Sequence, residues 1–101
     1  VVFAGAVINA FAKVGVGCII NTASVVEHDC TIDNFTHICP NVALAGGVSI
    51  GAKCWVGIGS QVKQLITIGD NCLIGAGSTV VKNIPDNVTA FGSPAVVIKS
   101  H

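Results

Sequence analysis

The amino-acid sequence predicts an all-β protein folded as a parallel β-helix, a solenoid of short stacked strands. Aliphatic residues recur at every sixth position from Val2 to Val80 without a break. Small residues mostly follow four positions later, and Gly, Asn or Asp fills nine of the fourteen positions three residues later. An α-helix would need a period of about 3.6 residues, and a sandwich would need longer alternating strands. A period of six fits only a repeated unit.

Each six-residue unit supplies one short strand and one turn, so three units close a triangular coil of eighteen residues. We expect the aliphatic side chains to stack in three inward columns, each burial contributing roughly 1.5–3 kcal/mol before chain entropy is subtracted. The expected strands centre, in chain order, on Val2, Ile8, Val14, Ile20, Val26, Ile32, Ile38, Leu44, Ile50, Val56, Val62, Ile68, Ile74 and Val80.

The cysteines fit this pattern as core residues. Four of the five fall on the small inward position, namely Cys18, Cys30, Cys54 and Cys72, and only Cys39 lies outside it. An odd number without paired spacing argues against a disulfide framework, and no zinc-binding spacing is present. Reduced thiols and the lack of a visible signal peptide favour a cytoplasmic protein.

The period fails near Asn83, where Pro85, Gly92 and Pro94 interrupt the repeat. We therefore expect a β-helix of about 4.5 coils over residues 1–84 and an irregular cap over residues 85–101 that protects the open end. The chain starts inside its repeat and without a methionine, so we expect a further segment to precede it in the full-length protein.

Composition excludes several functional classes. The formal net charge is zero, with only 10% charged residues, which favours neither nucleic acid nor an anionic membrane as a partner. The longest stretch without Asp, Glu, Lys or Arg contains Pro40 and two glycines and would make a poor membrane helix. The hydrophobic side chains must therefore be buried within protein.

The sequence VVEHDC suggests a catalytic histidine. Residues eighteen apart should lie about 4.8 Å apart in neighbouring coils, and the column through the histidine reads Ala10, His28, Gly46, Gln64 and Lys82. Gly46 leaves a notch beside His28, with free backbone N–H groups facing it. A carboxylate from Glu27 or Asp29 would fix the imidazole tautomer and raise its basicity, as a general base requires. The alternative is a surface histidine in a charged turn.

A second column brings His37 and the only tryptophan together, and reads Ile19, His37, Trp55 and Leu73. Here the alternatives are a functional histidine and a simple aromatic stack. Outward-pointing Phe11, Leu65 and Phe35 indicate that part of the wall is covered by a partner.

The run IINTASVVEHDCTIDNFTHICPNVALAGGVSIG, followed by WVGIGSQVKQ and FGSPA, resembles the bacterial hexapeptide-repeat sugar acetyltransferases. That family includes sialic acid O-acetyltransferases and UDP-4-amino-sugar N-acetyltransferases, and the resemblance covers nearly the whole chain. It implies a left-handed β-helix and direct acetyl transfer from acetyl-CoA to an amine or hydroxyl of a sugar or nucleotide-sugar. It further implies no metal, a homotrimer with acetyl-CoA between neighbouring β-helices, and an N-terminal nucleotide-sugar-binding domain that is absent here.

The resemblance also assigns residues. His28 matches the general base, and Asp29 matches the acid that raises its basicity, at a position where similar proteins often have Glu. Glu27 stays an alternative partner. Gly46 matches the glycine whose N–H faces the thioester oxygen. Leu65 departs from a glycine usual in the family. The expected cofactor-binding positions are Asn21, His37, Gly46, Gly47, Ile58, Ala76, Gly92 and Pro94.

Two other functions stay open at this point. A metalloenzyme of the γ-carbonic anhydrase type shares the repeat but needs three ligands per zinc with a close pair, which His28, His37 and His101 do not provide. A non-catalytic β-helix, either a scaffold or a remnant that binds CoA, is the other alternative.

Overall fold

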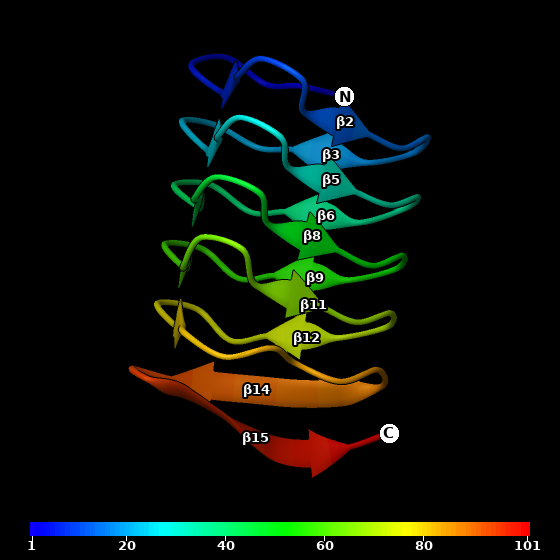
Figure 1. Cartoon of the computed structure of the whole chain (residues 1–101), viewed down its shortest axis with the longest axis vertical. Helices are drawn as coiled ribbons and strands as arrows, with labels where there is room; N and C mark the ends of the chain where they lie inside the picture. The colour runs from blue at the N-terminus through cyan, green and yellow to red at the C-terminus, as the bar shows by residue number, and fades with distance from the viewer.

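The computed structural model describes residues 1–101 and is an all-β solenoid of about five turns (Figure 1). Strands β1 to β13 have two residues each, and two longer strands end the chain. They are β1 (Val7–Ile8), β2 (Lys13–Val14), β3 (Ile19–Ile20), β4 (Val25–Val26), β5 (Thr31–Ile32), β6 (His37–Ile38), β7 (Ala43–Leu44), β8 (Ser49–Ile50), β9 (Trp55–Val56), β10 (Gln61–Val62), β11 (Thr67–Ile68), β12 (Leu73–Ile74), β13 (Thr79–Val80), β14 (Val88–Gly92) and β15 (Ala95–Ser100).

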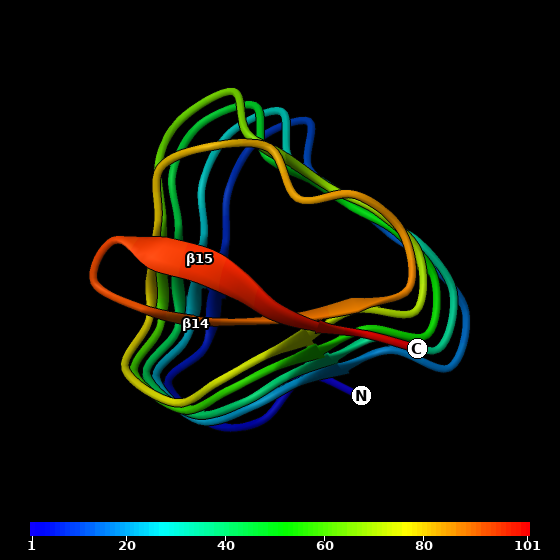
Figure 2. The same cartoon turned by 90° about the horizontal axis from the view of Figure 1, so that it is seen from below.

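The strands form three sheets that make the walls of a triangular prism, seen end-on in Figure 2. Sheet A has the order β3-β6-β9-β12-β14-β15, sheet B the order β1-β4-β7-β10-β13, and sheet C the order β2-β5-β8-β11. From β1 to β13 all pairing is parallel and joins residues eighteen apart, as in Val7 with Val25. The predicted eighteen-residue coil is confirmed, and the arrangement is consistent with a left-handed β-helix.

Three edges join these walls, and each is named by the sheets it connects. The B/C edge consists of the turns 9–11, 27–29, 45–47, 63–65 and 81–83. The C/A edge consists of the turns 15–17, 33–35, 51–53, 69–71 and 85–87. The A/B edge consists of the turns 3–5, 21–23, 39–41, 57–59 and 75–77.

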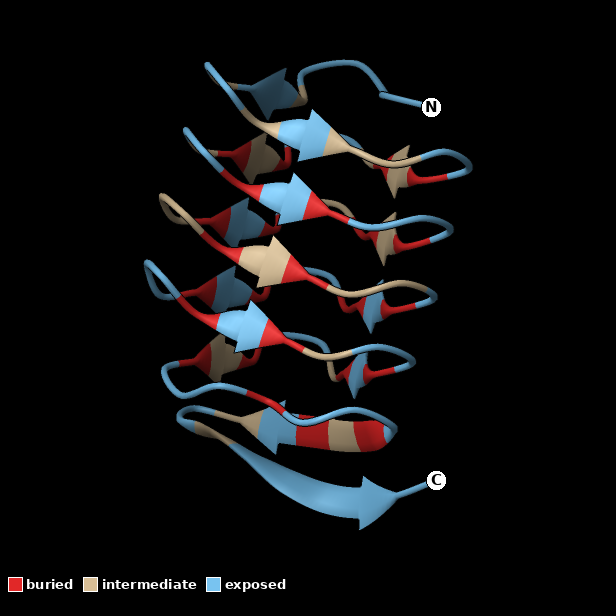
Figure 3. Ribbon diagram, turned by 45° about the vertical axis from the view of Figure 1, so that its right-hand side comes forward, coloured by how far each residue is buried: buried red, intermediate tan, exposed pale blue.

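The predicted aliphatic columns form the core. From Ile20 to Val80 all eleven inward aliphatic residues are buried, whereas Val2 and Ile8, in the first coil, remain partly exposed because no coil covers them. Figure 3 shows the resulting alternation of buried and exposed residues within the short strands. Each strand therefore presents one side chain to the core and one to the surface.

The small inward residues also act as hydrogen-bond donors. Each of seven Ser, Thr or Cys side chains donates to a backbone carbonyl in the next coil at 2.7–3.1 Å, fifteen residues later in all but the last pair. The pairs are Cys18–Asp33, Ser24–Cys39, Cys30–Ala45, Thr36–Gly51, Cys54–Gly69, Ser60–Gly75 and Cys72–Pro85. All five cysteines are unpaired, and burial raises the pKa of the Cys54 thiol to about 11.

The turns from 3–5 to 75–77 share one left-handed backbone conformation. The thirteen residues that occupy the third turn position, from Gly5 to Gly77, have φ between 55° and 75°. Glycine, Asn and Asp tolerate this left-handed region, but Phe11, Phe35 and Leu65 adopt it as well, at a cost of about 1–2 kcal/mol each. The solenoid therefore imposes its turn geometry on residues that disfavour it.

The solenoid continues past residue 84, where the sequence pattern ends. Strand β14 pairs in parallel with β12 through Leu73 and Thr89, which are sixteen residues apart, so the last coil is two residues shorter than the others. Val88 and Ala90 are buried beneath it, and β15 then folds back antiparallel to β14. The boundary expected at residue 84 thus falls inside the last coil, and the cap is a hairpin. The structure has no helix, and so none able to cross a membrane.

Candidate active site

A hollow of about 280 Å³ lies on the B/C edge and contains the predicted histidine. Six residues from three successive coils line it: His28, Asp29, Gly46, Gly47, Gln64 and Leu65. Their side chains come together because each turn places the same position on the edge eighteen residues later. The hollow is thus a direct product of the repeat.

His28 is paired with one of its two acidic neighbours. Its Nδ1 lies 3.1 Å from Asp29 Oδ2, and both side chains are about two-thirds exposed, at 65% and 63%. With Nδ1–H donating to this carboxylate, Nε2 is the unprotonated nitrogen and can accept a proton. Asp29 reaches the ring from a left-handed turn position with φ of 61°.

Glu27 is engaged elsewhere. Its Oε1 accepts a hydrogen bond of 2.7 Å from Asn9 Nδ2 in the preceding coil. The sequence left Glu27 and Asp29 as alternative partners of His28, and the structure pairs the histidine with Asp29 alone. Glu27 instead joins two coils along the edge of sheet B.

Gly46 is required by the close approach of His28. A Cβ atom at this position would lie 2.7 Å from both Cε1 and Nε2 of the imidazole, so the ring occupies the space that a side chain would fill. Gly47 lies in the left-handed region at φ of 70°, and a Cβ there would lie 2.7 Å from Leu65 Cδ2. The two glycines therefore form the floor between His28 and Leu65.

One backbone N–H group in each turn of this edge is free. At the second turn position of the B/C edge, the N–H groups of Ala10, His28, Gly46, Gln64 and Lys82 donate to no protein acceptor. Of the five corresponding N–H groups on the C/A edge, the four from Val16 to Asp70 are accepted by Asp or Asn side chains, and only that of Asp86 in the last coil is not. The pairs there are Val16–Asn34 at 2.9 Å, Asn34–Asp33 at 2.7 Å, Ala52–Asp70 at 2.8 Å and Asp70–Asp86 at 2.7 Å.

A second group of predicted residues lies on the A/B edge. Ile58 and Ala76 stack in neighbouring coils, joined by a bond of 2.8 Å from the Gly77 N–H to the Ile58 carbonyl, and their own N–H groups are free. Gly92, followed in the same turn by Pro94, donates its N–H to Ser78 Oγ at 3.2 Å. The two free N–H groups, of Ile58 and Ala76, form a short ladder of donors along the edge.

Asn21 and His37 belong to this second group. Asn21 Nδ2 lies 3.4 Å from His37 Nε2, and the Asn21 Oδ1 accepts the Thr22 N–H at 2.7 Å. The His37 and Trp55 ring centroids lie 4.4 Å apart with planes tilted by 57°, so the predicted contact is present but is not a parallel stack. His37 is on sheet A, and the B/C edge with His28 lies across the prism from it.

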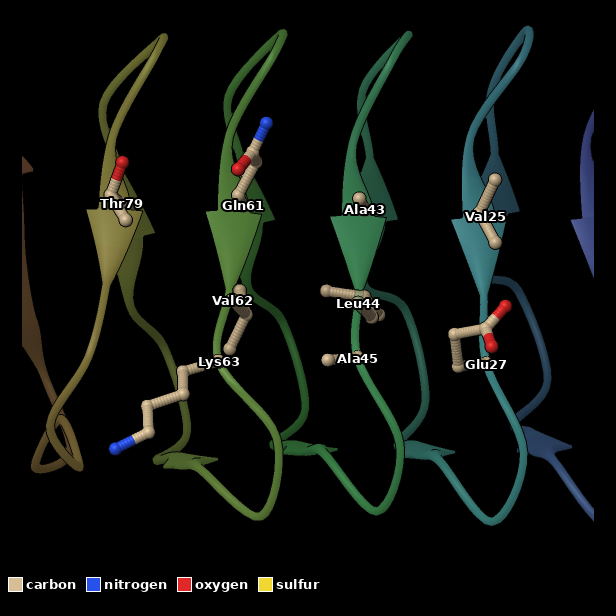
Figure 4. A pocket seen from close by; sticks show the side chains of 9 residues that line it. All are labelled: Val25, Glu27, Ala43, Leu44, Ala45, Gln61, Val62, Lys63 and Thr79. Carbon is tan, nitrogen blue, oxygen red and sulfur yellow. The ribbon is translucent and has the colours of Figure 1, made fainter.

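The predicted site residues are thus brought together in two groups, on the two edges that flank sheet B. Between them, a broad open hollow covers the face of this sheet (Figure 4). The outward side chains of sheet B are uncharged, and Figure 4 shows Glu27, Ala45 and Lys63 following one another beside them along the stacked coils. Within a single chain, His28 and His37 therefore lie in separate groups and do not share one site.

Two lining residues escaped the sequence-based assignment. Gln64 and Leu65 face the hollow from the coil that follows Gly46 and Gly47, and Leu65 is 74% exposed. The eighteen-residue column already contained Gln64 directly after Gly46, so the signal was present. No group of three His, Cys, Asp or Glu residues that could hold a metal ion occurs in the structure.

Comparison with known proteins identifies the repeat. Residues 47–82 match the family model described as bacterial transferase hexapeptide (six repeats). Galactoside O-acetyltransferase of Lactococcus lactis is 45% identical over 73 residues, which are 66% of this chain and 35% of that protein. The putative colanic acid biosynthesis acetyltransferase WcaF of Escherichia coli is 38% identical over 52 residues, which are 52% of this chain and 29% of that protein.

Solved structures agree with the sequence matches. A mutant of perosamine N-acetyltransferase from Caulobacter crescentus, in complex with CoA and GDP-perosamine, superposes with a TM-score of 0.95 at 43% identity over 97% of this chain and 47% of that chain. The acetyltransferase domain of PglB from Neisseria gonorrhoeae, in complex with acetyl coenzyme A, gives 0.82 at 31% identity over 96% and 56%. This chain therefore spans about a third of the curated relatives and about half of these neighbours.

Proposed function

We propose that this protein is an acetyltransferase. It carries the bacterial transferase hexapeptide repeat and shares the fold of sugar acetyltransferases. The protein transfers an acetyl group from acetyl-CoA to an amine or hydroxyl of a sugar or nucleotide-sugar. The observation that carries this proposal is the imidazole of His28, oriented by Asp29 and packed against Gly46, a residue whose N–H is free. A proton acceptor and an oxyanion donor then face one hollow.

The proposed reaction is a direct attack. His28 Nε2 accepts the proton of the acceptor amine or hydroxyl as its nitrogen or oxygen bonds to the thioester carbonyl carbon. The Gly46 N–H donates to the developing oxyanion, and the C–S bond then breaks, with the CoA sulfur taking the proton from His28. General base catalysis typically contributes about 10²- to 10⁴-fold, and an oxyanion donor about 10²- to 10³-fold.

The A/B edge fits the cofactor. The pantetheine arm of CoA carries two amide groups, and the free N–H groups of Ile58 and Ala76 are suitable donors to their carbonyls. Asn21 and His37 would lie near the thioester end, and the turn with Gly92 and Pro94 near the adenine end. No such open ladder exists on the C/A edge, since its donors are already bound.

We propose a homotrimer as the working assembly. A threefold arrangement with sheet B facing the axis would bring the A/B edge of one copy beside the B/C edge of the next, because these edges flank the same sheet. The uncharged outward side chains of sheet B support such contact. The cleft between copies would then hold His28 from one chain and His37 from its neighbour.

A CoA-binding remnant without turnover is the second candidate, since the free N–H groups of Ile58 and Ala76 could hold CoA whether or not transfer follows. A thiol-release assay with acetyl-CoA and a panel of amino-sugar and nucleotide-sugar acceptors separates the two. We expect acceptor-dependent release of CoA from the wild-type protein. Tight CoA binding without release would favour the remnant, and absence of both would reject an acetyl-CoA site altogether.

A further inference from the structure

The small inward residue Cys30 is connected to the proposed oxyanion donor through a single peptide group. Its Sγ–H donates to the carbonyl of Ala45 at 3.1 Å, and Cys30 is fully buried. The Ala45 carbonyl and the Gly46 N–H belong to the same peptide unit, whose atoms are held in a plane with the two groups pointing in opposite directions. Whatever fixes the carbonyl therefore fixes the direction of the N–H.

We propose that Cys30 is a positioning residue, which acts through the Ala45–Gly46 peptide to aim the Gly46 N–H into the hollow beside His28. This inference rests on the proposed function. Donation to the carbonyl also polarises the peptide, and chains of hydrogen bonds strengthen one another in this way. The thiol thus orients the oxyanion donor and raises its strength without touching the substrate.

The distribution of such donors supports this assignment. On the B/C edge, the residues equivalent to Cys30 in the other coils are Ala12, Val48 and Ile66, none of which can donate a side-chain hydrogen bond. The Ala45–Gly46 peptide is consequently the only one on that edge whose carbonyl receives a side-chain donor. It is also the peptide that leads into Gly46, the residue against which the imidazole packs.

The same bond occurs on the C/A edge without the same consequence. There Cys54 donates to the Gly69 carbonyl at 3.0 Å, but the N–H of the following residue, Asp70, is bound by Asp86. At Gly46 the N–H stays free. Burial raises the pKa of the Cys30 thiol, which keeps it a donor at neutral pH.

Three variants separate positioning from packing. Cys30→Ser keeps a donor, as buried Ser24 and Ser60 do at equivalent positions, whereas Cys30→Ala and Cys30→Val remove it. We expect Ala and Val to lower kcat by about five- to tenfold with KM for acetyl-CoA within twofold of wild type. Cys30→Ser should stay within about twofold of wild-type kcat. The matched control Cys54→Ala should lose thermal stability yet retain kcat.

Equal loss of kcat in Ser, Ala and Val, or the same loss in Cys54→Ala, would overturn the proposal. A second readout does not depend on turnover: the amide proton resonance of Gly46 in the intact protein. In Cys30→Ala and Cys30→Val it should move upfield and exchange faster, and in Cys30→Ser it should not. An unchanged resonance in all variants would also reject the positioning role, whereas an inactive wild type with the expected shifts would reject only the proposed function.

Discussion

The B/C and C/A edges share one backbone geometry but differ in how their polar groups are satisfied. On the C/A edge, side chains of Asn34, Asp70 and Asp86 accept N–H groups of the preceding coil and fill the space beside its glycines. On the B/C edge the N–H groups at the same turn position are free, and the space beside Gly46 is taken by His28. An edge without these accepting Asp and Asn side chains keeps free N–H donors and can therefore bind a ligand.

The energetic cost of this difference is small. A hydrogen bond from a capping side chain contributes about 0.5–1.5 kcal/mol, and an exposed N–H without a cap is still hydrated. The B/C edge forgoes a little stability in each coil, and its donors remain available to a substrate that displaces the water. Substitutions on the two edges should therefore have opposite consequences for activity and stability.

Replacing His28 with Ala should have the largest effect. We expect kcat to fall at least a hundredfold, because the proton acceptor is lost, while CoA binding and melting temperature stay nearly unchanged since the side chain is exposed. Steady-state thiol release, calorimetric CoA titration and thermal melting measure the three quantities. Wild-type turnover in this variant would remove His28 from the mechanism.

Gly46→Val should come next. Its Cβ would meet the imidazole at 2.7 Å and displace it, so kcat should fall and KM for acetyl-CoA should rise, together lowering kcat/KM about tenfold or more. Gly51→Ala on the C/A edge is the control, since its Cβ would meet Asp70 and backbone atoms instead. Gly51→Ala should lower the melting temperature and keep the wild-type kcat. A loss of kcat with unchanged stability would contradict the assignment of a purely structural role to the C/A edge.

Asp70→Ala tests the role of the accepting side chains on the C/A edge directly. Removing the carboxylate that accepts the Ala52 N–H at 2.8 Å should lower the free energy of unfolding by about 1 kcal/mol without changing kcat. Gln64→Ala, on the B/C edge, removes a side chain for which the structure gives no hydrogen bond. It should leave the free energy of unfolding within about 0.5 kcal/mol of wild type. Urea denaturation of both variants provides the comparison. A smaller loss in Asp70→Ala than in Gln64→Ala would count against the capping argument.

Alkaline pH should have the smallest effect. Because the folded pKa of Cys54 is raised to about 11 from an ordinary value of 9.0, the folded state holds this proton more tightly than the unfolded chain. The tighter proton binding by Cys54 contributes to the free energy of unfolding in full below pH 9. This contribution is lost as pH rises towards 11, with less than about 1 kcal/mol lost by pH 9.5. Melting curves of wild type and Cys54→Ser between pH 7 and 9.5 should diverge in slope, and parallel curves would argue against this origin.

The repeat made much of the fold and of the site predictable. A strict period of six determines which residues share a column, so the contact of His28 with Gly46 and that of His37 with Trp55 followed from counting. Counting does not determine rotamers. The choice of Asp29 over Glu27 depends on Asn9, which holds Glu27 from the preceding coil, and no periodic signal marks that bond.

Two further features lay outside the reach of the pattern. The last coil closes with sixteen residues because the link from Val80 to Ile84, on the B/C edge, is two residues shorter than a full unit: Ile84 already pairs with Ile68, sixteen positions earlier. Side chains of Asn83 and Asn87 bond to the coil before. The hydrogen bonds donated by the core thiols could not be predicted from the sequence, because packing alone explains a Cys at a small inward position equally well. Only the geometry separates Cys30, whose carbonyl partner leads to Gly46, from the other core cysteines.

A crystal structure of the protein with acetyl-CoA tests the central claim most directly, namely that the uncapped B/C edge is the reacting edge. We expect the thioester oxygen within hydrogen-bond distance of the Gly46 N–H, the carbonyl carbon facing His28 Nε2, and the pantetheine along the A/B edge of a neighbouring copy. Acetyl-CoA bound along the capped C/A edge, or with its thioester away from His28, would contradict the account.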